Sequence, residues 1–199
     1  MPLAFDEYDD PTVPGWFNFS QVYAWMVDAA PDPAVFVEVG AWLGRSTAYL
    51  ARRVQASGKR IQLYVVDSWT GSPGEFWHEK EVARYGGELF AVFCANMTRL
   101  GVLDLLHPIR APSVQAADEF ADESADFVYI DAAHDYESVA ADLRAWWPKV
   151  KVGGWIAGHD YPTWEGVQQA VDEFFGRVSL FPSATSWIVR KLTGRNLPS

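Results

Sequence analysis

The stretch AVFVEVGAWLGRSTAYLARRV, residues 34–54, decides the fold class of this chain. Residues 34–40 form an apolar run that ends in a glycine, which is typical of a strand covered on both faces of a parallel sheet. Residues 43–54 then place apolar side chains at the spacing of one helix face, and Gly58 ends that pattern. The stretch therefore predicts a buried strand, a glycine turn and a helix.

Apolar runs alternate with helical patterns along the rest of the chain. Such alternation needs crossover connections, and crossovers produce a mostly parallel sheet with helices on both faces. We therefore predict a doubly wound α/β fold with a seven-stranded, mostly parallel sheet. Further strands are expected at residues 61–67, 105–110, 126–131, 152–158, 178–180 and 186–190. Helices are expected at residues 20–28, capped by Ser20, and at 75–85, 88–100, 113–120, 137–147, where Pro148 stops the helix, and 165–175.

The length of 199 residues suits one domain with a hydrophobic core. Residues 1–33 are expected to form an arm and a helix, residues 34–192 the folded domain, and residues 193–199 a tail. Residues 68–101 read as an insert that forms an acceptor pocket or a lid, with Trp69 and Trp77 as candidates for contacts there.

The charge balance excludes some classes of partner. Lys and Arg number 16 against 26 Asp and Glu, a formal net charge of −10, so nucleic acid and anionic membrane surfaces are poor partners. One cysteine, Cys94, allows no intrachain disulfide and fits a reducing compartment, and the sequence indicates no signal peptide and no membrane span, so we expect a cytoplasmic protein. The ten Trp and the aromatic N-terminal arm suit a homodimer, a core or a ligand pocket alike.

The ligand site is expected where the parallel strands end, because ligands of such sheets bind beyond the carboxyl ends of the strands. Gly40 and Gly44 bracket the first strand-to-helix turn, where backbone can approach a ligand closely. Asp67 ends the next strand, at the place where an acid accepts hydrogen bonds from a ribose diol. A dinucleotide needs a third glycine where this chain has Trp42, which favours S-adenosylmethionine over NAD. The two glycines alone could also make only a tight turn.

A second group of polar residues follows the fourth and fifth predicted strands. Asp131 and His134 follow one strand, and His159 and Asp160 follow the other. Neighbouring strands lie about 4.8 Å apart, so these ends can converge. A histidine near neutrality can remove a proton from a hydroxyl, and carboxylates can bind Mg²⁺ or, together with histidine, Mn²⁺. Asp135 has the simpler interpretation of a helix cap, and His134 that of a loop support.

Four segments carry a resemblance to a known family. They are VEVGAWLGRSTAYL (37–50), VVDSW (65–69), DFVYIDAAHDYESVAADLRAWWPKVKVGGWIAGHDY (126–161) and GVQQAVDEFF (166–175). Together they resemble class I S-adenosylmethionine-dependent methyltransferases, in particular a bacterial subgroup that includes small-molecule and sugar O-methyltransferases of natural-product pathways. The resemblance covers residues 34–190, and it identifies residues 34–192 as a methyltransferase domain.

The resemblance implies a role for each matching residue. Glu38 and Gly40 would hold the methionine amino end, and Asp67 would hold the ribose. Ser68 and Trp69 would flank the adenosine. The remaining cofactor contacts implied are Gly44, Ser46, Ser113 beside the adenine, and Asp131.

The same resemblance implies the chemistry. The expected reaction moves a methyl group from S-adenosylmethionine to a hydroxyl of a small-molecule acceptor, with Asp131, His134 and His159 as catalytic residues. A divalent metal, Mg²⁺ or Mn²⁺, would bind Asp131, His159 and Asp160, although His159 stands where some relatives have an acid. The alternatives are a catalytically inactive cofactor-binding protein and a hydroxylase-type or NAD-dependent enzyme on the same fold.

Overall fold

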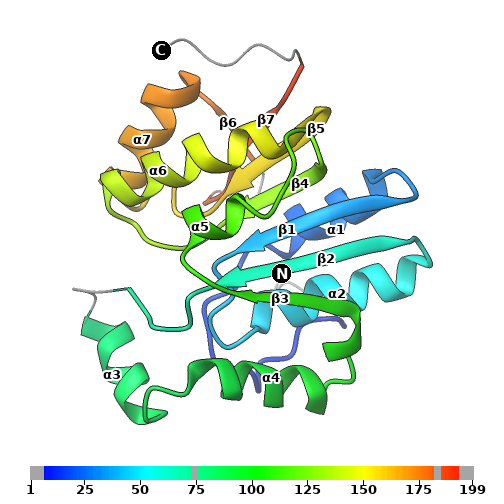
Figure 1. Ribbon diagram of the computed structural model, residues 1–199, viewed down its shortest axis with the longest axis vertical. Coiled ribbons are helices and arrows are strands. Elements are labelled where there is room, and N and C mark those ends of the chain that lie inside the picture. Colours follow the sequence, from blue (N-terminus) through cyan, green and yellow to red (C-terminus); the bar gives the residue numbers. More distant parts are fainter. Residues whose placement is uncertain (1–6, 73–75, 182–184, 193–199) are drawn as a thin grey trace, which may run out of the picture.

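A computed structural model describes residues 7–72, 76–181 and 185–192 of the chain. Its strands form one seven-stranded sheet in the order β3-β2-β1-β4-β5-β7-β6, with β1 to β5 parallel and β7 antiparallel to both neighbours. The predicted doubly wound, mostly parallel sheet is therefore confirmed (Figure 1). The strand bounds are Ala34–Val39 (β1), Ile61–Asp67 (β2), Leu106–Arg110 (β3), Ala125–Ile130 (β4), Val150–Gly158 (β5), Ser179–Leu180 (β6) and Trp187–Arg190 (β7).

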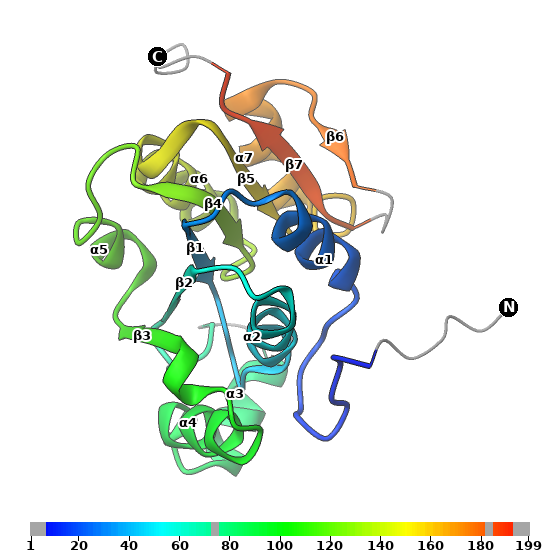
Figure 2. The same ribbon diagram turned by 90° about the vertical axis from the view of Figure 1, so that its right-hand side faces the viewer.

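Helices cover both faces of the sheet (Figure 2). One face packs against α1 (Ser20–Ala29), α2 (Arg45–Ser57) and α4 (Leu89–Arg99). The other packs against α5 (Ser113–Ala117), α6 (Tyr136–Trp146) and α7 (Glu165–Phe175). The remaining helices are α3 (Phe76–Arg84) and the short 3-10 helices η1 (Leu103–Leu105) and η2 (Trp147–Lys149).

Alternation along the strands divides the core in two. Phe127 and Tyr129 of β4 belong to the cluster under α1 and α2, whereas Val128 and Ile130 belong to the cluster under α5 to α7. Successive side chains of a strand point to opposite faces, so a strand with helices on both sides must be apolar throughout. This explains why the continuous apolar runs of the sequence predicted the strands well.

Helix boundaries differ from the predicted ones where the backbone turns sharply. Ser20 is the first residue of α1 and gives no side-chain cap. The second helix begins at Arg45, later than predicted, because Gly44 adopts a left-handed conformation with φ of 95°. Pro148 lies inside the 3-10 helix that follows α6. Asp135 does cap α6, since its carboxylate accepts the Ser138 N–H at 2.9 Å.

Three strands meet closely at Gly40. The Gly40 N–H donates to the Val66 carbonyl at 2.8 Å, and the Asp131 N–H donates to the Val39 carbonyl at 2.8 Å. Gly40 has φ of 90°, and a Cβ there would overlap the carbonyl oxygen of Asp131. Only glycine fits this position without moving the end of β4.

The N-terminal arm is held against the domain by ion pairs. Asp9 pairs with Arg45 at the start of α2 at 2.7 Å, and Asp10 lies 3.7 Å from Arg52 and 3.9 Å from Arg99. These ion pairs tie the arm to α2 and α4 before α1 begins. Residues 1–6 and the expected tail, 193–199, lie outside the described residues.

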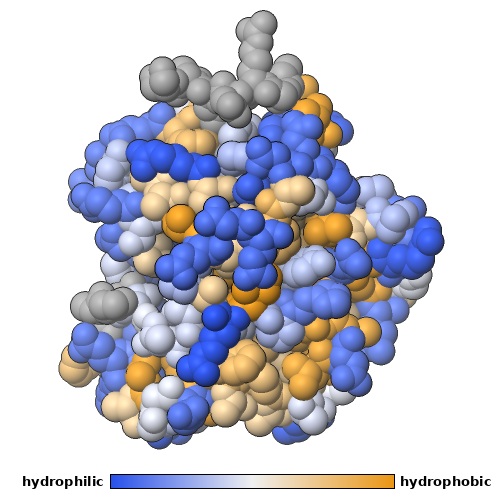
Figure 3. Space-filling model, in the orientation of Figure 1, coloured by the Kyte–Doolittle hydropathy of each residue, from blue (hydrophilic) through white to orange (hydrophobic). Residues whose placement is uncertain are grey.

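The surface gives no sign of a membrane-spanning helix. Within the described part of the chain, every helix is too short or too polar to cross a bilayer. Figure 3 shows hydrophilic residues spread over one face of the molecule, interrupted by small apolar patches.

Candidate active site

A cavity of about 1050 Å³ opens at the carboxyl ends of the parallel strands. Its wall combines the N-terminal arm, the loop after β1, the end of β2, the start of α5, one face of α6 and the segments after β4 and β5. The cavity thus lies where the topology of a doubly wound sheet predicts a ligand site. Of the residues expected to contact the cofactor, the following line it: Gly40, Ser46, Asp67, Ser68, Ser113 and Asp131.

The carboxylate of Asp67 organises the loop after β1. One of its oxygens, Oδ2, accepts the N–H groups of Ala41 at 2.8 Å and Trp42 at 2.9 Å, and Oδ1 accepts the Trp69 N–H at 2.6 Å. Burial raises the pKa of Asp67, while these three hydrogen bonds act against that rise. A carboxylate offers about four acceptor positions, so one remains for a ligand hydroxyl.

Glu38 supports that loop from below instead of facing the cavity. It is 1 % exposed and accepts hydrogen bonds from the Tyr23 hydroxyl at 2.8 Å and from the Thr47 hydroxyl. Burial raises the pKa of Glu38 to about 7. These contacts give the side chain a structural role, and its contact with the methionine amino end stays a prediction.

Gly44 and Trp69 are also absent from the described cavity wall. A Cβ on Gly44 would meet Met97 and Phe93, so this glycine allows α4 to pack closely on the loop. Trp69 is 1 % exposed, and its Nε1–H donates to the Trp42 carbonyl at 2.8 Å. Both residues therefore have packing roles in this structure, and their contacts with the cofactor or acceptor stay predictions. The side chain of Trp77 lies outside the described residues.

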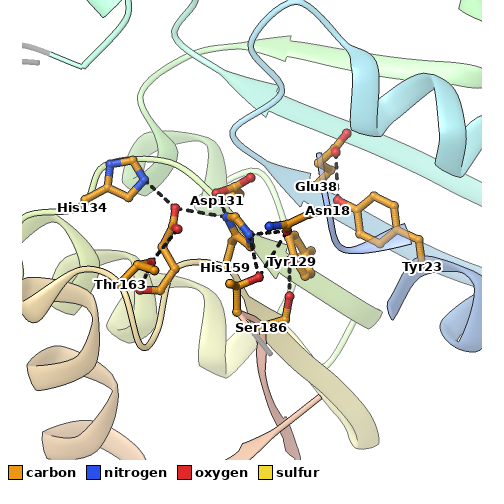
Figure 4. Close-up of polar contacts among 11 residues, drawn as sticks. Asn18, Tyr23, Glu38, Tyr129, Asp131, His134, His159, Thr163 and Ser186 are labelled. Carbon is orange, nitrogen blue, oxygen red and sulfur yellow. Dashed lines mark hydrogen bonds and ion pairs between the residues drawn. The ribbon is translucent and has the colours of Figure 1, made fainter. Parts of the chain in front are cut away.

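Two histidines and two acids converge where β4 and β5 end (Figure 4). One oxygen of Asp160, Oδ2, lies 3.1 Å from His134 Nε2 and 3.1 Å from His159 Nδ1. His159 Nδ1 also lies 3.4 Å from Asp131 Oδ1. Asp160 has φ of 60°, an unfavourable angle for a residue with a Cβ. This turn aims its carboxylate at both rings, and residues in such strained conformations cluster at functional sites.

His159 lies between two carboxylates in this cluster. Burial lowers its pKa, but hydrogen bonds to Asp131 and Asp160 outweigh burial and raise the pKa to about 9. The other ring nitrogen, Nε2, lies 2.8 Å from Asn18 Oδ1 and 3.0 Å from the Thr185 hydroxyl. A charged imidazole has no lone pair to take a proton, which suits His159 to balancing the two carboxylates, and its catalytic role stays a prediction.

His134 lies in the cavity wall between Trp164 and Asp160. Its ring stacks on Trp164 with centroids 4.5 Å apart, and both side chains line the cavity. The Asp160 carboxylate lies 3.1 Å from Nε2 of His134, so the neutral ring would carry its proton on Nε2. Hydrogen bonds from His134 and His159 hold the pKa of Asp160 well below its usual range even though burial acts to raise it.

The same cluster offers metal ligands in a different set from the expected one. Donor atoms of Asp131, His134 and Asp160 all lie within 4.8 Å of one another. One histidine and two carboxylates suit a divalent cation such as Mn²⁺. His159 is not in this group, and its Nδ1 lies 3.4 Å from Asp131 Oδ1 and 3.1 Å from Asp160 Oδ2. Both predicted acids belong to this set, which contains His134 in place of the predicted His159, and metal binding itself stays a prediction.

Several wall residues escaped the sequence analysis. Asn18, Trp16 and Thr185 reach the cavity from the arm and from the segment before β7, where no strand-end pattern marks them. Asp142 is a buried acid on α6 that also lines the cavity. His78, which lies in the predicted acceptor insert, lines it as well and stacks on Trp42 with centroids 4.6 Å apart. An acid at a predicted buried helix position was the only signal available for Asp142.

A family model described as a methyltransferase domain matches residues 37–161, more than half of the chain. The chain belongs to the methyltransferase-domain family. The resemblance to class I methyltransferases that use S-adenosylmethionine is thereby confirmed, and the matched segment contains the loop after β1, Asp67, Asp131 and the two histidines.

Relatives of known structure share the fold. The O-methyltransferase NovP is 20 % identical with a TM-score of 0.69, covering 88 % of this chain and 80 % of that one. The calicheamicin methyltransferase CalS11 is 19 % identical with a TM-score of 0.61, covering 85 % and 76 %. An rRNA methylase from Streptococcus thermophilus is 14 % identical with a TM-score of 0.58, covering 87 % and 95 %.

A relative in sequence is the uncharacterized protein y4gI of Sinorhizobium fredii (strain NBRC 101917 / NGR234). It is 27 % identical over 161 residues, which are 80 % of this chain and 16 % of y4gI. This chain therefore spans only about a sixth of the length of that relative.

The raised pKa of Glu38 predicts a pH-dependent effect of its replacement. Between about pH 4.5 and 7 the folded protein keeps a proton that the unfolded chain has released, so the contribution of Glu38 to stability falls as pH rises. We expect the unfolding free energy of Glu38→Gln relative to wild type to be about 1–3 kcal/mol higher at pH 8 than at pH 5. Urea unfolding at both pH values measures this. The exposed Glu137→Gln is the matched control, and a pH-independent difference for Glu38→Gln would contradict the account.

Proposed function

We propose that this chain transfers the methyl group of S-adenosylmethionine to a hydroxyl of a small-molecule acceptor. The observation that carries the proposal is one continuous cavity that joins the Asp67 loop to the cluster of His134 and Asp160. The first supplies contacts for a nucleoside, and the second supplies a base for an acceptor. The volume of about 1050 Å³ exceeds the usual range of about 300–1,000 Å³ for one small ligand, so it suits a cofactor and an acceptor together.

The cofactor end fits a sulfonium ligand better than a dinucleotide. Trp42 has φ of 50° and occupies the turn where a pyrophosphate would need glycine. Asp67 accepts three backbone N–H groups, so its carboxylate keeps one acceptor position for a ribose hydroxyl. Asp131 adds a carboxylate to the wall, which favours a positively charged sulfonium over a phosphate.

The reaction proposed is an in-line displacement. The acceptor oxygen forms a bond to the methyl carbon, the carbon–sulfur bond breaks, and its electron pair stays on sulfur to give S-adenosylhomocysteine. His134 takes the acceptor proton on Nδ1, and Asp160 stabilises the resulting imidazolium. Asp131 and the charged His159 keep that carboxylate in place.

A metal-assisted version has its own support. Asp131, His134 and Asp160 are suitable in type and spacing for a divalent cation, which would lower the pKa of an acceptor hydroxyl when bound. The His159 cation beside both carboxylates opposes a second positive charge there. For this reason we favour His134 as the base and treat the metal as the alternative to test.

The acceptor wall suits a ring-shaped small molecule. Trp16, Trp42 and Trp164 line the cavity together with His78. Aromatic faces hold sugars and aromatic rings by stacking and burial of apolar surface. CalS11 is named as a TDP-rhamnose 3′-O-methyltransferase of calicheamicin biosynthesis, which supports a natural-product acceptor by analogy of fold. The net charge of −10 disfavours nucleic acid as the acceptor.

The cofactor assignment predicts the effect of one isosteric change. We expect S-adenosylhomocysteine to bind wild type and to bind Asp67→Asn at least about tenfold more weakly, since the amide cannot accept both a ribose hydroxyl and the loop N–H groups. Isothermal titration measures both affinities, with Asp118→Asn, an exposed acid after α5, as control. Absence of binding to folded wild type would refute the assignment and favour an NAD-dependent or other enzyme.

The assignment of His134 as the base predicts that its replacement lowers turnover and leaves the affinity for the cofactor product unchanged. We expect His134→Gln to lower methyl transfer to phenol and sugar acceptors by about 10²–10⁴-fold while S-adenosylhomocysteine affinity stays unchanged. Mass spectrometry of the product measures turnover, and His107→Gln on β3 is the control. Full turnover in His134→Gln would exclude this base. Loss of turnover in EDTA with recovery in Mn²⁺ would establish the metal version instead.

A further inference from the structure

The amide of Asn18 lies in the cavity wall beside the cluster of acids and histidines, and the proposed chemistry gives it no role. Its oxygen, Oδ1, lies 2.8 Å from His159 Nε2 (Figure 4). The Thr185 hydroxyl donates to the same oxygen at 3.2 Å. The oxygen end of the amide therefore faces the protein.

The nitrogen end of the same amide remains for a ligand. Among the described residues, no protein group accepts a hydrogen bond from Asn18 Nδ2, and the residue is exposed in the cavity wall. An amide nitrogen carries two hydrogens and only donates, whereas the carboxylates of Asp131 and Asp160 only accept. Asn18 therefore supplies what the acids cannot, which is a donor for an oxygen atom of a bound molecule.

The chain is fixed on both sides of Asn18. The next residue, Phe19, is buried, and its ring stacks on Tyr129 with centroids 4.6 Å apart. Before Asn18, Arg45 donates to the Gly15 carbonyl at 3.1 Å and pairs with Asp9 at 2.7 Å. A donor held in this way loses little conformational freedom when a ligand binds, which favours a role in recognition.

One imidazole ring separates Asn18 from the reacting end of the cavity. His159 directs Nε2 to Asn18, whereas its Nδ1 lies 3.1 Å from Asp160 Oδ2 and 3.4 Å from Asp131 Oδ1. A six-membered ring of a ligand is wide enough to place one hydroxyl near the acids and to present a second oxygen to the Asn18 amide. Two oxygens on one ring therefore match the two kinds of group that this part of the wall offers.

We propose that Asn18 is a specificity-determining residue, which donates a hydrogen bond from its amide nitrogen to a second oxygen on the ring that carries the reacting hydroxyl. The expected acceptors are ring diols, a class that includes sugars, and a ring with a single hydroxyl is a poor acceptor. The assignment rests on the proposed function, because it presupposes methyl transfer to a hydroxyl in this cavity. The simpler alternative is that Asn18 only holds His159 in place, in which case its replacement slows the methylation of all acceptors equally.

The test measures kcat/KM for acceptors that differ only in the second oxygen. The probes are the benzenediols against phenol, and the cyclohexanediols against cyclohexanol. We expect wild type to prefer at least one diol over its counterpart with a single hydroxyl by about tenfold or more. Asn18→Asp keeps an oxygen toward His159 and removes the donor, so we expect it to lose about fivefold or more of that preference.

Two further variants control the comparison. Gln21→Glu makes the same change from amide to acid at an exposed position of α1, and we expect it to keep the preference of wild type. Thr185→Val removes the other contact of His159 Nε2, so we expect it to slow the diols and the single hydroxyls by the same factor. Titration of S-adenosylhomocysteine into each variant verifies that the cofactor site is folded.

The outcomes distinguish the role of Asn18 from the proposed function. If wild type methylates diols and single hydroxyls alike, or if folded Asn18→Asp keeps the full preference, the role is overturned and the proposed function stands. If wild type binds S-adenosylhomocysteine but methylates no probe, the role and the transfer to ring hydroxyls are both overturned. If wild type binds no S-adenosylhomocysteine, the proposed function fails at cofactor binding and the role fails with it. Should Asn18→Asp not fold, Asn18→Ala removes both ends of the amide and is expected to lose the same preference.

Discussion

The carboxylate of Asp67 holds together the part of the molecule on which the site depends. By accepting the N–H groups of Ala41 and Trp42, it ties the end of β2 to the loop that leaves β1. At the same point Gly40 lets β1 approach β4 so closely that no side chain fits between them. The ends of three neighbouring strands are thereby fixed relative to one another, and ligand groups can be positioned against a rigid edge. Asp67 both shapes this loop and lines the cavity, and it could be singled out from sequence because it ends a strand.

Charge balance organises the other half of the cavity. Two carboxylates from neighbouring strand ends would repel each other in a partly buried site, and the imidazolium of His159 offsets that repulsion. His159 is in turn held by Asn18 of the N-terminal arm and by Thr185. The arm is therefore part of the site, and the ion pair of Asp9 with Arg45 helps to keep it there. His134 lies between the Asp160 carboxylate and the stacked ring of Trp164, which is a suitable environment for a histidine that changes protonation.

Sequence periodicity predicted the fold and the acids at strand ends because strand positions follow directly from apolar runs. Asp67, Asp131 and Asp160 all lie where those runs end, and the structure brings them to one edge. The roles of the two histidines could not be predicted in this way. They depend on the left-handed turn at Asp160 and on Asn18, which lies 141 residues from His159 in sequence. Glu38 lies at the predicted place in the chain, yet its side chain points to Tyr23 and Thr47, because strand alternation assigns it to the face under α1 and α2. In the sequence, Asp142 looks like any other polar residue of an amphipathic helix. Its burial results from packing against the start of α5, which the helix pattern does not show.

The most direct test of the central claim is a crystal structure of the protein with S-adenosylhomocysteine. The account predicts the ribose at Asp67, the sulfur directed toward the cluster of Asp131, His134 and Asp160, and the base against the start of α5. A ligand bound with its base at the histidine cluster, or bound outside this cavity, would contradict the account, because the methyl group of the cofactor would then have no base within reach.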